Sequence, residues 1–353
     1  MKVVLLAPTP PPHGGIAGWT KRMMQAKLKN GWEVVVVDEK VTGNRDAYNG
    51  SKKNYVDEAK RCLRIWGDLK KALKDPEAVV VQACIPAGTT SMMREIVSAY
   101  ITKKRKRKFI VHFRCTLPNM VKSTTAKKIF KKLTDLCDCV FVLNTASVEF
   151  LKEVNPNIKC ELIPNFIETE AIKERIVYNE ELKNLTYVGG VIEEKGCDLI
   201  ASVAKRFPDK QFRLVGNVDM DTSAFPANIV LLGEKPKEFV QKELDTTDAF
   251  LFLTRYTGEG FSNALAEAMS HSLPCIVSDW AANADMIENK GGVVLENYEV
   301  ADAIEAINKI EKSEIRREMG RWNCDKVKTA YCDSVVTGMY VDAYEKLVKC
   351  NKM

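Results

Sequence analysis

Short apolar runs alternate along the chain with longer segments in which apolar residues recur at helical spacing. The first cycle predicts a strand over Lys2 to Ala7, a Pro-rich loop over Pro8 to Gly15, a helix over Ile16 to Lys29 and a strand over Glu33 to Asp38. A strand, a loop, a helix and a second strand in this order are how a doubly wound α/β domain begins.

The same alternation continues to the end of the chain. Several of the later apolar runs are nearly continuous, which is typical of strands covered on both faces in a parallel sheet. The further predicted helices cover about 53–74, 89–102 and, in several segments, 300–348. The further predicted strands cover 78–83, 109–113, 139–143, 211–215, 229–233, 248–254 and 293–295.

Length and composition favour a globular protein of two domains. The chain has 353 residues, of which 46% are hydrophobic and 28% charged. No opening stretch is apolar for long enough to span a membrane, and Met1 to Ala7 is too short for a signal peptide. We expect a cytoplasmic protein.

The eleven cysteines show no paired zinc-binding spacing, so we expect reduced, structural thiols.

The formal charge of +6 conceals an asymmetry between the two halves. Residues 1–170 carry 30 Lys or Arg and 17 Asp or Glu, a charge of +13, which leaves −7 for the remainder. Two cationic runs, Lys103 to Lys108 and Lys122 to Lys132, lie in the basic half. They are either solvated helix ends or a contact with anionic lipid, for which Ile129, Phe130 and Leu133 would supply an apolar face. Nucleic acid is disfavoured because neither run carries interleaved aromatic residues for base stacking.

The stretch from Leu253 to Pro274 joins a predicted buried strand to a helix through a turn that contains two glycines. Good helix formers follow the turn, and Ser262 or Asn263 is placed to cap the first helical turn. The free N–H groups of such a turn bind anions well, so this stretch is a candidate phosphate site.

Two carboxylates lie in this stretch, Glu259 in the turn and Glu267 in the helix. At 1.5 Å per helical residue, their separation in sequence corresponds to roughly 12 Å, about the span from a sugar across a diphosphate to a ribose. Each carboxylate is therefore placed to hold one end of a nucleotide-sugar. The alternative is that both are solvated surface residues.

The string EGFSNALAEAM, with the following Pro274 to Ser278, resembles the E-x7-E signature of retaining glycosyltransferases of the GT-B fold, in the large family 4. The resemblance implies an α/β protein of two Rossmann-like, doubly wound domains that face across a cleft, with a C-terminal helix that returns to the first domain. We therefore expect an acceptor-side domain over 1–170, a donor domain over 171–330 and the returning helix over 331–353.

A second segment, Leu185 to Gly196, resembles the family's strand-G-R-hydrophobic-x-x-E-K-G turn, in which Arg and Lys grip the donor diphosphate. Lys195 occupies the Lys position, but Gly190 occupies the Arg position. Another cation would have to replace the missing Arg, and the candidates are Lys21, Arg22, Arg114, Arg213 and Arg255.

In the first domain, His112 and Arg114 lie at the carboxyl end of a predicted strand, where open α/β sheets place ligand-binding residues. A lone His is otherwise more often structural. The resemblance implies a His beside the donor sugar, and it places a glycine-rich loop like Gly14-Gly15 near the donor diphosphate and acceptor. Cys160 to Asn165 partly resembles the family's I-P-N-G segment at the interdomain crossover.

The sequence thus predicts a retaining, metal-independent glycosyltransferase that moves a sugar from a nucleotide-sugar, UDP-linked or GDP-linked, to a hydroxyl of a lipid-linked or cell-surface glycan acceptor. We expect no cofactor, metal or nucleic acid. We do expect peripheral attachment to the inner face of the membrane. The predicted residues are catalytic His112, Lys195 and Glu259; donor-binding Gly14, Gly15, Gly190, Gly216, Gly260, Phe261, Ser262, Asn263 and Glu267; and the acceptor or phosphate candidates Arg114 and Arg255.

Two alternatives remain open at this point. A nucleotide-sugar 2-epimerase shares the two-domain fold, but the E-x7-E string speaks against it. A non-catalytic nucleotide-sugar-binding subunit is favoured by the Gly at position 190, which removes a cation from the turn that would stabilise the leaving diphosphate.

Overall fold

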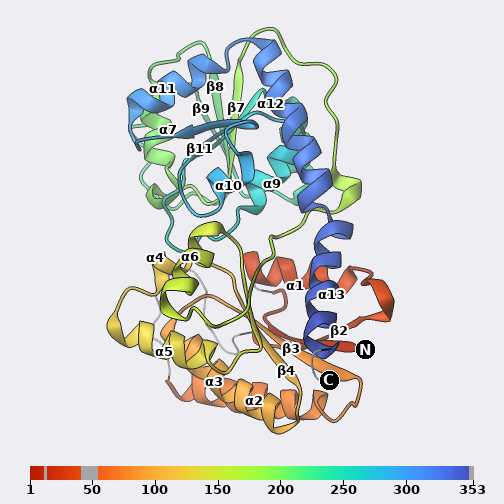
Figure 1. Cartoon of the computed structure of the whole chain (residues 1–353). Helices are drawn as coiled ribbons and strands as arrows, with labels where there is room; N and C mark the ends of the chain where they lie inside the picture. Colours follow the sequence, from red (N-terminus) through yellow and green to blue (C-terminus); the bar gives the residue numbers. More distant parts are fainter. Residues whose placement is uncertain (12–13, 41–54, 350–353) are drawn as a thin grey trace. The chain divides into compact units, whose positions relative to one another are not determined.

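The computed structural model describes residues 1–11, 14–40 and 55–349, so parts of the predicted loop over 8–15 and of the predicted helix over 53–74 lie outside the described residues. The chain forms two compact units (Figure 1). One consists of Met1–Asn165 together with the chain from Val336 onward, and the other consists of Phe166–Val335. Each unit contains one six-stranded sheet in which all strand pairs are parallel.

The first unit has the strand order β2-β1-β3-β4-β5-β6. Its strands are β1 (Lys2–Ala7), β2 (Glu33–Asp38), β3 (Ala78–Ile85), β4 (Lys108–Phe113), β5 (Cys139–Val142) and β6 (Cys160–Leu162). Its helices are α1 (Gly15–Gln25), α2 (Tyr55–Ala72), α3 (Thr89–Lys104), α4 (Leu117–Met120), α5 (Thr124–Thr134) and α6 (Thr145–Val154), with a short 3-10 turn over Lys29–Gly31.

Alternation along the strands divides the first unit into two cores. One set of side chains, such as Val81 and Val111, packs with apolar residues of α2, α3 and α5. The other set includes His112 and Phe141, which both contact Tyr340 of the last helix, α13 (Asp333–Lys349). His112 also contacts Trp19 of α1. Helices on both faces explain why these strands are nearly continuous apolar runs.

The last helix returns to the first unit, as the resemblance implied. From Val336 onward α13 belongs to that unit, and Tyr340 and Tyr344 of this helix are fully buried. The Tyr344 hydroxyl donates to Gln82 Oε1 of β3 at 2.6 Å. This contact satisfies a buried polar side chain in the middle of the sheet.

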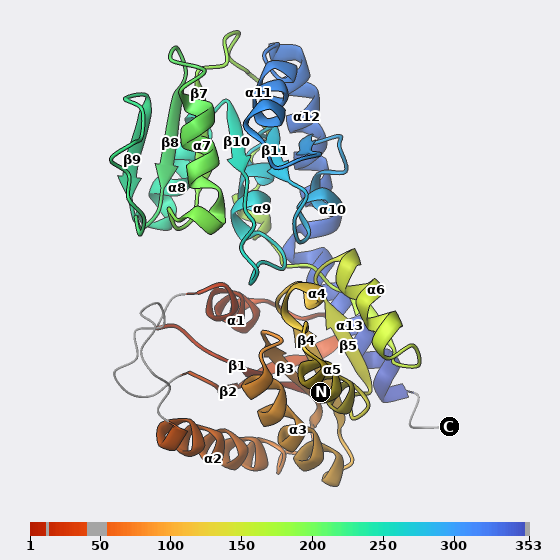
Figure 2. The ribbon, with the colours of Figure 1, turned by 90° about the vertical axis from the view of Figure 1, so that its left-hand side faces the viewer.

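The second unit has the strand order β12-β11-β10-β7-β8-β9 (Figure 2). Its strands are β7 (Asn184–Val188), β8 (Gln211–Val215), β9 (Ile229–Gly233), β10 (Ala249–Phe252), β11 (Cys275–Ser278) and β12 (Gly292–Leu295). Its helices are α7 (Cys197–Ala204), α8 (Lys237–Thr246), α9 (Asn263–Ser270), α10 (Asn283–Ile287), α11 (Val300–Lys309) and α12 (Ser313–Lys326), with 3-10 turns over Thr169–Ala171 and Glu193–Lys195 and a π-helical turn over Val327–Tyr331.

The strand order of the second unit reverses between β7 and β10, which are hydrogen-bonded neighbours. Chain connections leave these two strands in opposite directions along the sheet, which opens a crevice at their carboxyl ends. Ligands of open α/β sheets bind at such a switch point. The loops that follow β7 and β10 are therefore where this unit is built to hold a ligand.

Three expectations can be compared directly with these elements. The first helix, predicted to reach Lys29, ends at Gln25, because Ala26 and Leu28 are extended. The prediction that the apolar side of α5 is available to lipid is wrong. Phe130 and Leu133 are fully buried in the core, and Ile129 packs against the core. The ten cysteines in the described ranges are all free thiols, as expected. None of the helices described is long and apolar enough to cross a bilayer.

Candidate functional site at the switch point of the second unit

The loop after β7 is held close to the end of β10 by a glycine. Gly196 follows the 3-10 turn Glu193–Lys195 and has a φ of 79°, a conformation that side chains rarely adopt. A Cβ atom at this position would lie 2.1 Å from the carbonyl oxygen of Leu253. Because only Gly fits, the turn that carries Lys195 can approach the chain leaving β10.

Hydrogen bonds tie the loop after β10 to its neighbours. The Arg255 N–H donates to the Glu194 carbonyl at 2.8 Å, which joins this loop to the turn that contains Lys195. The Ser278 hydroxyl, at the end of β11, donates to the Thr254 carbonyl at 2.6 Å. The backbone that presents Glu259 is thus fixed on both sides.

Lys195 and Glu259 meet in this loop pair. Lys195 Nζ lies 2.5 Å from Glu259 Oε2, and the two side chains are 19% and 13% exposed. The ammonium also lies 4.9 Å from the ring centroid of Tyr256 and 5.6 Å from that of Phe252. A cation held by one carboxylate and two aromatic faces is well positioned, while the partial exposure leaves it within reach of a ligand.

The start of α9 has the expected cap. Ser262 is the N-cap residue, and its hydroxyl accepts from the Leu265 N–H at 3.2 Å. Phe261 is 5% exposed and packs edge-on against Tyr331 at a centroid distance of 5.2 Å. Asn263 begins the helix and Gly260 precedes Phe261, so the backbone predicted to bind an anion lies at the N-terminus of α9. Its binding of an anion stays a prediction.

Glu267 lies one turn into α9 and is half-buried. Glu259 lies in the turn after β10 and Glu267 in the helix that follows, which matches the strand-turn-helix setting that the E-x7-E resemblance implies. Its role toward a ribose remains a prediction.

The glycines after β7 and β8 lie next to each other. Gly216 has a φ of 151°, and a Cβ atom there would lie 1.8 Å from the Gly189 carbonyl oxygen, so this contact excludes any other residue. Gly190 differs, because among the described residues beyond its two chain neighbours no atom lies within 4 Å of the position its Cβ would take. The small residue at 190 is therefore not required by packing, and a longer side chain would fit.

The five cations considered as substitutes for the missing Arg have very different surroundings. Arg213 points to α8, where its guanidinium pairs with Glu243, including Nη2 to Oε2 at 2.9 Å. Arg114 is buried in the first unit, and Lys21 and Arg22 belong to α1. Arg255 is exposed, and its guanidinium lies 3.6 Å from the ring centroid of Tyr298. Of the five, it is the cation that shares a loop pair with Lys195.

His112 and Arg114 occupy a buried cluster in the first unit. The side chain of His112 is fully buried, and Tyr340 Oη lies 3.2 Å from its Nδ1. Arg114 Nη1 lies 3.3 Å from both ring nitrogens, and its guanidinium stacks 4.4 Å from the Trp19 ring and also donates to Asn165. Burial and the Arg114 charge lower the pKa of His112 well below its usual value, so the ring is neutral.

Gly14 and Gly15 begin α1 after the loop that follows β1. The strand order of the first unit reverses between β2-β1 and β3, so this loop also follows a strand at a switch point. In the part of the chain that the structure describes, and leaving aside chain neighbours, no atom lies within 4 Å of a Cβ at either glycine. Their exposed backbone fits the predicted ligand loop, and no packing contact requires glycine there.

Sequence reasoning did not single out three aromatic residues of the second unit. Tyr256 contacts the Lys195 ammonium, Trp280 Nε1 donates to the Tyr256 carbonyl at 2.8 Å, and the Tyr298 hydroxyl donates to the Leu253 carbonyl at 2.7 Å. Burial raises the pKa of Tyr298 to about 12, so it donates as a neutral phenol. Each of them follows the end of a strand by two to four residues. This position after a strand is the feature by which sequence reasoning could have found them.

Solved structures share this architecture. Sucrose-phosphate synthase (tll1590) from Thermosynechococcus elongatus has a TM-score of 0.78 at 14% identity, covering 99% of each chain. Anabaena Alr3699/HepE in complex with UDP and glucose has a TM-score of 0.72 at 12% identity, covering 98% of this chain and 100% of that one. The lipopolysaccharide outer core galactosyltransferase WaaB has a TM-score of 0.72 at 16% identity, covering 98% and 99%. These similarities, with two Rossmann-like units, define the GT-B fold.

Residues 168–323 match the family model of glycosyl transferases group 1. The matched segment contains the Lys195 turn, the Glu259 turn and α9. This match covers most of the second unit, and together with the shared fold it indicates a glycosyltransferase of the GT-B type. No curated protein matches the chain significantly in sequence.

Proposed function

We propose that the chain transfers a sugar from a nucleoside diphosphate donor to an acceptor hydroxyl with retention at the anomeric carbon, as a member of family 4. The observation that carries the proposal is the Lys195–Glu259 pair at the switch point of the second unit, directly before the N-terminus of α9. A cation, a carboxylate and the N–H groups of a helix N-terminus are what a diphosphate joined to a sugar requires.

In this proposal the diphosphate competes with Glu259 for the Lys195 ammonium. The carboxylate is then released to accept hydrogen bonds from sugar hydroxyls. As the bond from the anomeric carbon to the diphosphate breaks and the bond to the acceptor oxygen forms, the hydroxyl proton of the acceptor passes to the leaving phosphate oxygen. Lys195 and the amides at Phe261 to Asn263 stabilise the charge on this phosphate. Arg255 supplies the second cation in place of the Arg missing at Gly190.

This chemistry requires no metal or cofactor, because the leaving charge is met by side-chain and backbone donors. A UDP-sugar is the favoured donor, since the Anabaena structure with the same fold holds UDP and glucose. A lipid-linked or cell-surface glycan is the proposed acceptor, and the lipopolysaccharide galactosyltransferase among the similar structures supports that class. We place the enzyme at the cytoplasmic face of a membrane.

A melting screen with UDP, GDP, ADP and their sugars identifies the donor. Stabilisation follows RT ln(1+[L]/Kd), about 2.7 kcal/mol at a hundredfold excess of ligand over Kd. Lys195→Ala serves as the comparison, because it should lose the shift produced by the cognate nucleotide. Equal shifts in both proteins would place the diphosphate elsewhere and contradict the site.

The second candidate is a non-catalytic nucleotide-sugar-binding subunit, and Gly190 is the observation that favours it. Incubation of the protein with its donor distinguishes the alternatives. A transferase releases nucleotide faster when an acceptor is added, and a binding subunit releases none. A 2-epimerase would release nucleotide only together with an altered sugar.

A further inference from the structure

An exposed apolar stripe runs along α3 of the first unit. Met93, Val97 and Tyr100 are 56%, 36% and 55% exposed, and their spacing of four and three residues places them on one side of the helix. The opposite side of α3, including Met92 and Ala99, is buried in the core. The stripe is therefore not part of the core of this unit.

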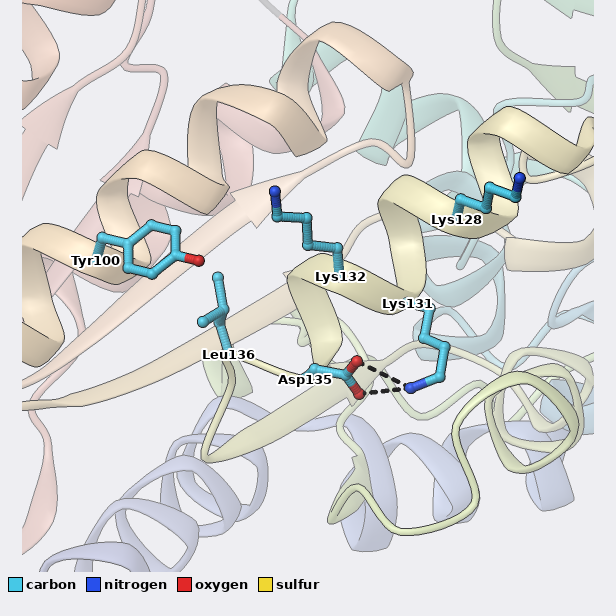
Figure 3. A pocket seen from close by; sticks show the side chains of 6 residues that line it. All are labelled: Tyr100, Lys128, Lys131, Lys132, Asp135 and Leu136. Carbon is cyan, nitrogen blue, oxygen red and sulfur yellow. Dashed lines mark hydrogen bonds and ion pairs between the residues drawn. The ribbon is translucent and has the colours of Figure 1, made fainter.

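Lysines of α5 border the end of this stripe. Tyr100 and Leu136 line a shallow hollow of about 380 Å³ together with Lys128, Lys131, Lys132 and Asp135 (Figure 3). The carboxylate of Asp135 already pairs with Lys131, at 2.8 Å. The side chains of Lys128 and Lys132 are exposed.

The surrounding sequence is strongly cationic. Residues 103–138 contain twelve Lys or Arg and only two Asp, a net charge of +10. Both acids have lysine partners. Asp135 pairs with Lys131, and Asp138 lies 3.3 Å from Lys108 and 3.7 Å from Lys103. The two acids offset only two of the twelve positive charges of this segment, one of which belongs to the buried Arg114.

We propose that this surface, the α3–α5 face made of Met93, Val97, Tyr100, Lys128 and Lys132, docks on an anionic lipid bilayer. Apolar side chains enter the boundary between headgroups and acyl chains, while lysines stay among the phosphates, and Tyr suits this interface because one end of its ring is polar. A bilayer matches both parts of the face. A nucleic acid would use the charge but leave the Met93 and Val97 stripe without a partner.

The charge alone does not identify this face. The sequence pattern predicted that the apolar side of α5 would face the lipid, but this side packs in the core. The apolar contribution comes instead from α3, and α5 supplies the cations. A neighbouring pair of helices therefore forms the amphipathic surface that neither helix forms by itself.

The inference adds a partner to the proposed function, since a lipid-linked acceptor is reached from a bilayer surface. It is tested without any transfer reaction. Binding to vesicles and turnover with a soluble acceptor analogue are separate measurements, so failure of one leaves the other standing.

The charge component is tested with the Lys128→Glu/Lys132→Glu double variant. Sedimentation is measured with vesicles of phosphatidylcholine containing roughly one third phosphatidylglycerol. Since each Lys near such a surface contributes about fivefold to binding, the partition coefficient should fall by roughly 25-fold or more. Lys242→Glu/Lys309→Glu is the matched control, with the same charge change on exposed helical positions of the second unit, and it should retain most of the binding.

The apolar component is tested with Met93→Ser/Tyr100→Ser. These exposed positions should tolerate the change, which thermal melting checks, and binding should fall severalfold at every salt concentration. Ile176→Ser/Val177→Ser, at residues that are 85% and 79% exposed in the second unit, is the control. Equal losses in the test and control variants, or binding that ignores lipid charge, would overturn the proposal. Tight binding to RNA with no binding to vesicles would assign the charge to a different partner.

Discussion

The ammonium of Lys195 lies 2.5 Å from a carboxylate oxygen of Glu259, although 64 residues separate them in sequence. Each group offsets the charge of the other. A diphosphate that binds here must displace the carboxylate from the ammonium or share the ammonium with it. The pair therefore couples the phosphate end of a donor to the carboxylate proposed for its sugar.

Substitution of Glu259 tests this coupling. Glu259→Gln removes the charge that competes for Lys195, so free nucleoside diphosphate should bind as tightly as before or more tightly. Sugar transfer should fail, with kcat/KM for the intact donor reduced by roughly 10²-fold, because the contact that orients the sugar acts in the transition state. Calorimetry with the nucleotide and steady-state kinetics with the donor measure the two effects. Weaker nucleotide binding in this variant would mean that Glu259 contacts the nucleotide itself.

Glu267 should show the opposite division. Glu267→Ala removes a proposed partner of a ribose hydroxyl, so binding of the free nucleotide should weaken by about 1.5 to 3 kcal/mol, typical of a hydrogen bond to a charged group. The same calorimetric titration measures it, and Glu299→Ala, beyond the site at the N-cap of α11, serves as a control for loss of an acidic side chain. If Glu267→Ala binds nucleotide normally, the ribose assignment is wrong.

The local part of this site could be predicted from the sequence. An apolar strand, a glycine turn and a run of helix formers are near neighbours in the chain, and Ser262 caps α9 as its position indicated. Such features depend on propensity and spacing within about twenty residues, which a sequence displays directly.

The contact between Lys195 and Glu259 could not be predicted in the same way. It depends on β7 and β10 being neighbours in the sheet, and strand order is decided by packing of the whole unit. The sequence also could not rank the five cations considered as substitutes for the Arg missing at position 190, for a related reason. Arg213 matches the required charge, but its pairing with Glu243 depends on how α8 packs beside the sheet. The apolar side of α5 was visible as a pattern, whereas the element that covers it was not.

Gly190 offers a gain-of-function experiment. The space around its Cβ position is open, so Arg should fit without strain and restore the cation that the family's turn carries. Gly190→Arg should strengthen binding of the nucleoside diphosphate by about 1.5 to 3 kcal/mol, as expected for a charge-assisted hydrogen bond. Gly190→Ala is the matched control, since it changes the backbone preference without adding charge, and its affinity should stay unchanged. An Arg variant that binds no better than the Ala variant would show that the diphosphate does not reach this loop.

His112 predicts a specific dependence of stability on pH. Burial first, and the Arg114 guanidinium second, lower its pKa in the folded protein well below the value of about 6.5 expected in the unfolded chain. The unfolded state therefore gains a proton below about pH 6.5 that the folded state does not. The stability is fully present above that pH and is lost as pH falls, by about 1.4 kcal/mol per pH unit.

His112→Gln keeps a polar side chain beside Tyr340 and Arg114 but does not titrate. Its melting temperature should fall less than that of the unmodified protein between pH 7 and 5, because the Asp and Glu side chains are the same in both proteins and only His112 is removed. His271→Gln is the comparison, because burial also lowers the pKa of His271 but its Asp245 partner opposes the shift, so its effect should be smaller. An unchanged slope in His112→Gln would mean that His112 accepts a proton in the folded protein. The neutral ring inferred from its burial and from the Arg114 charge would then be wrong.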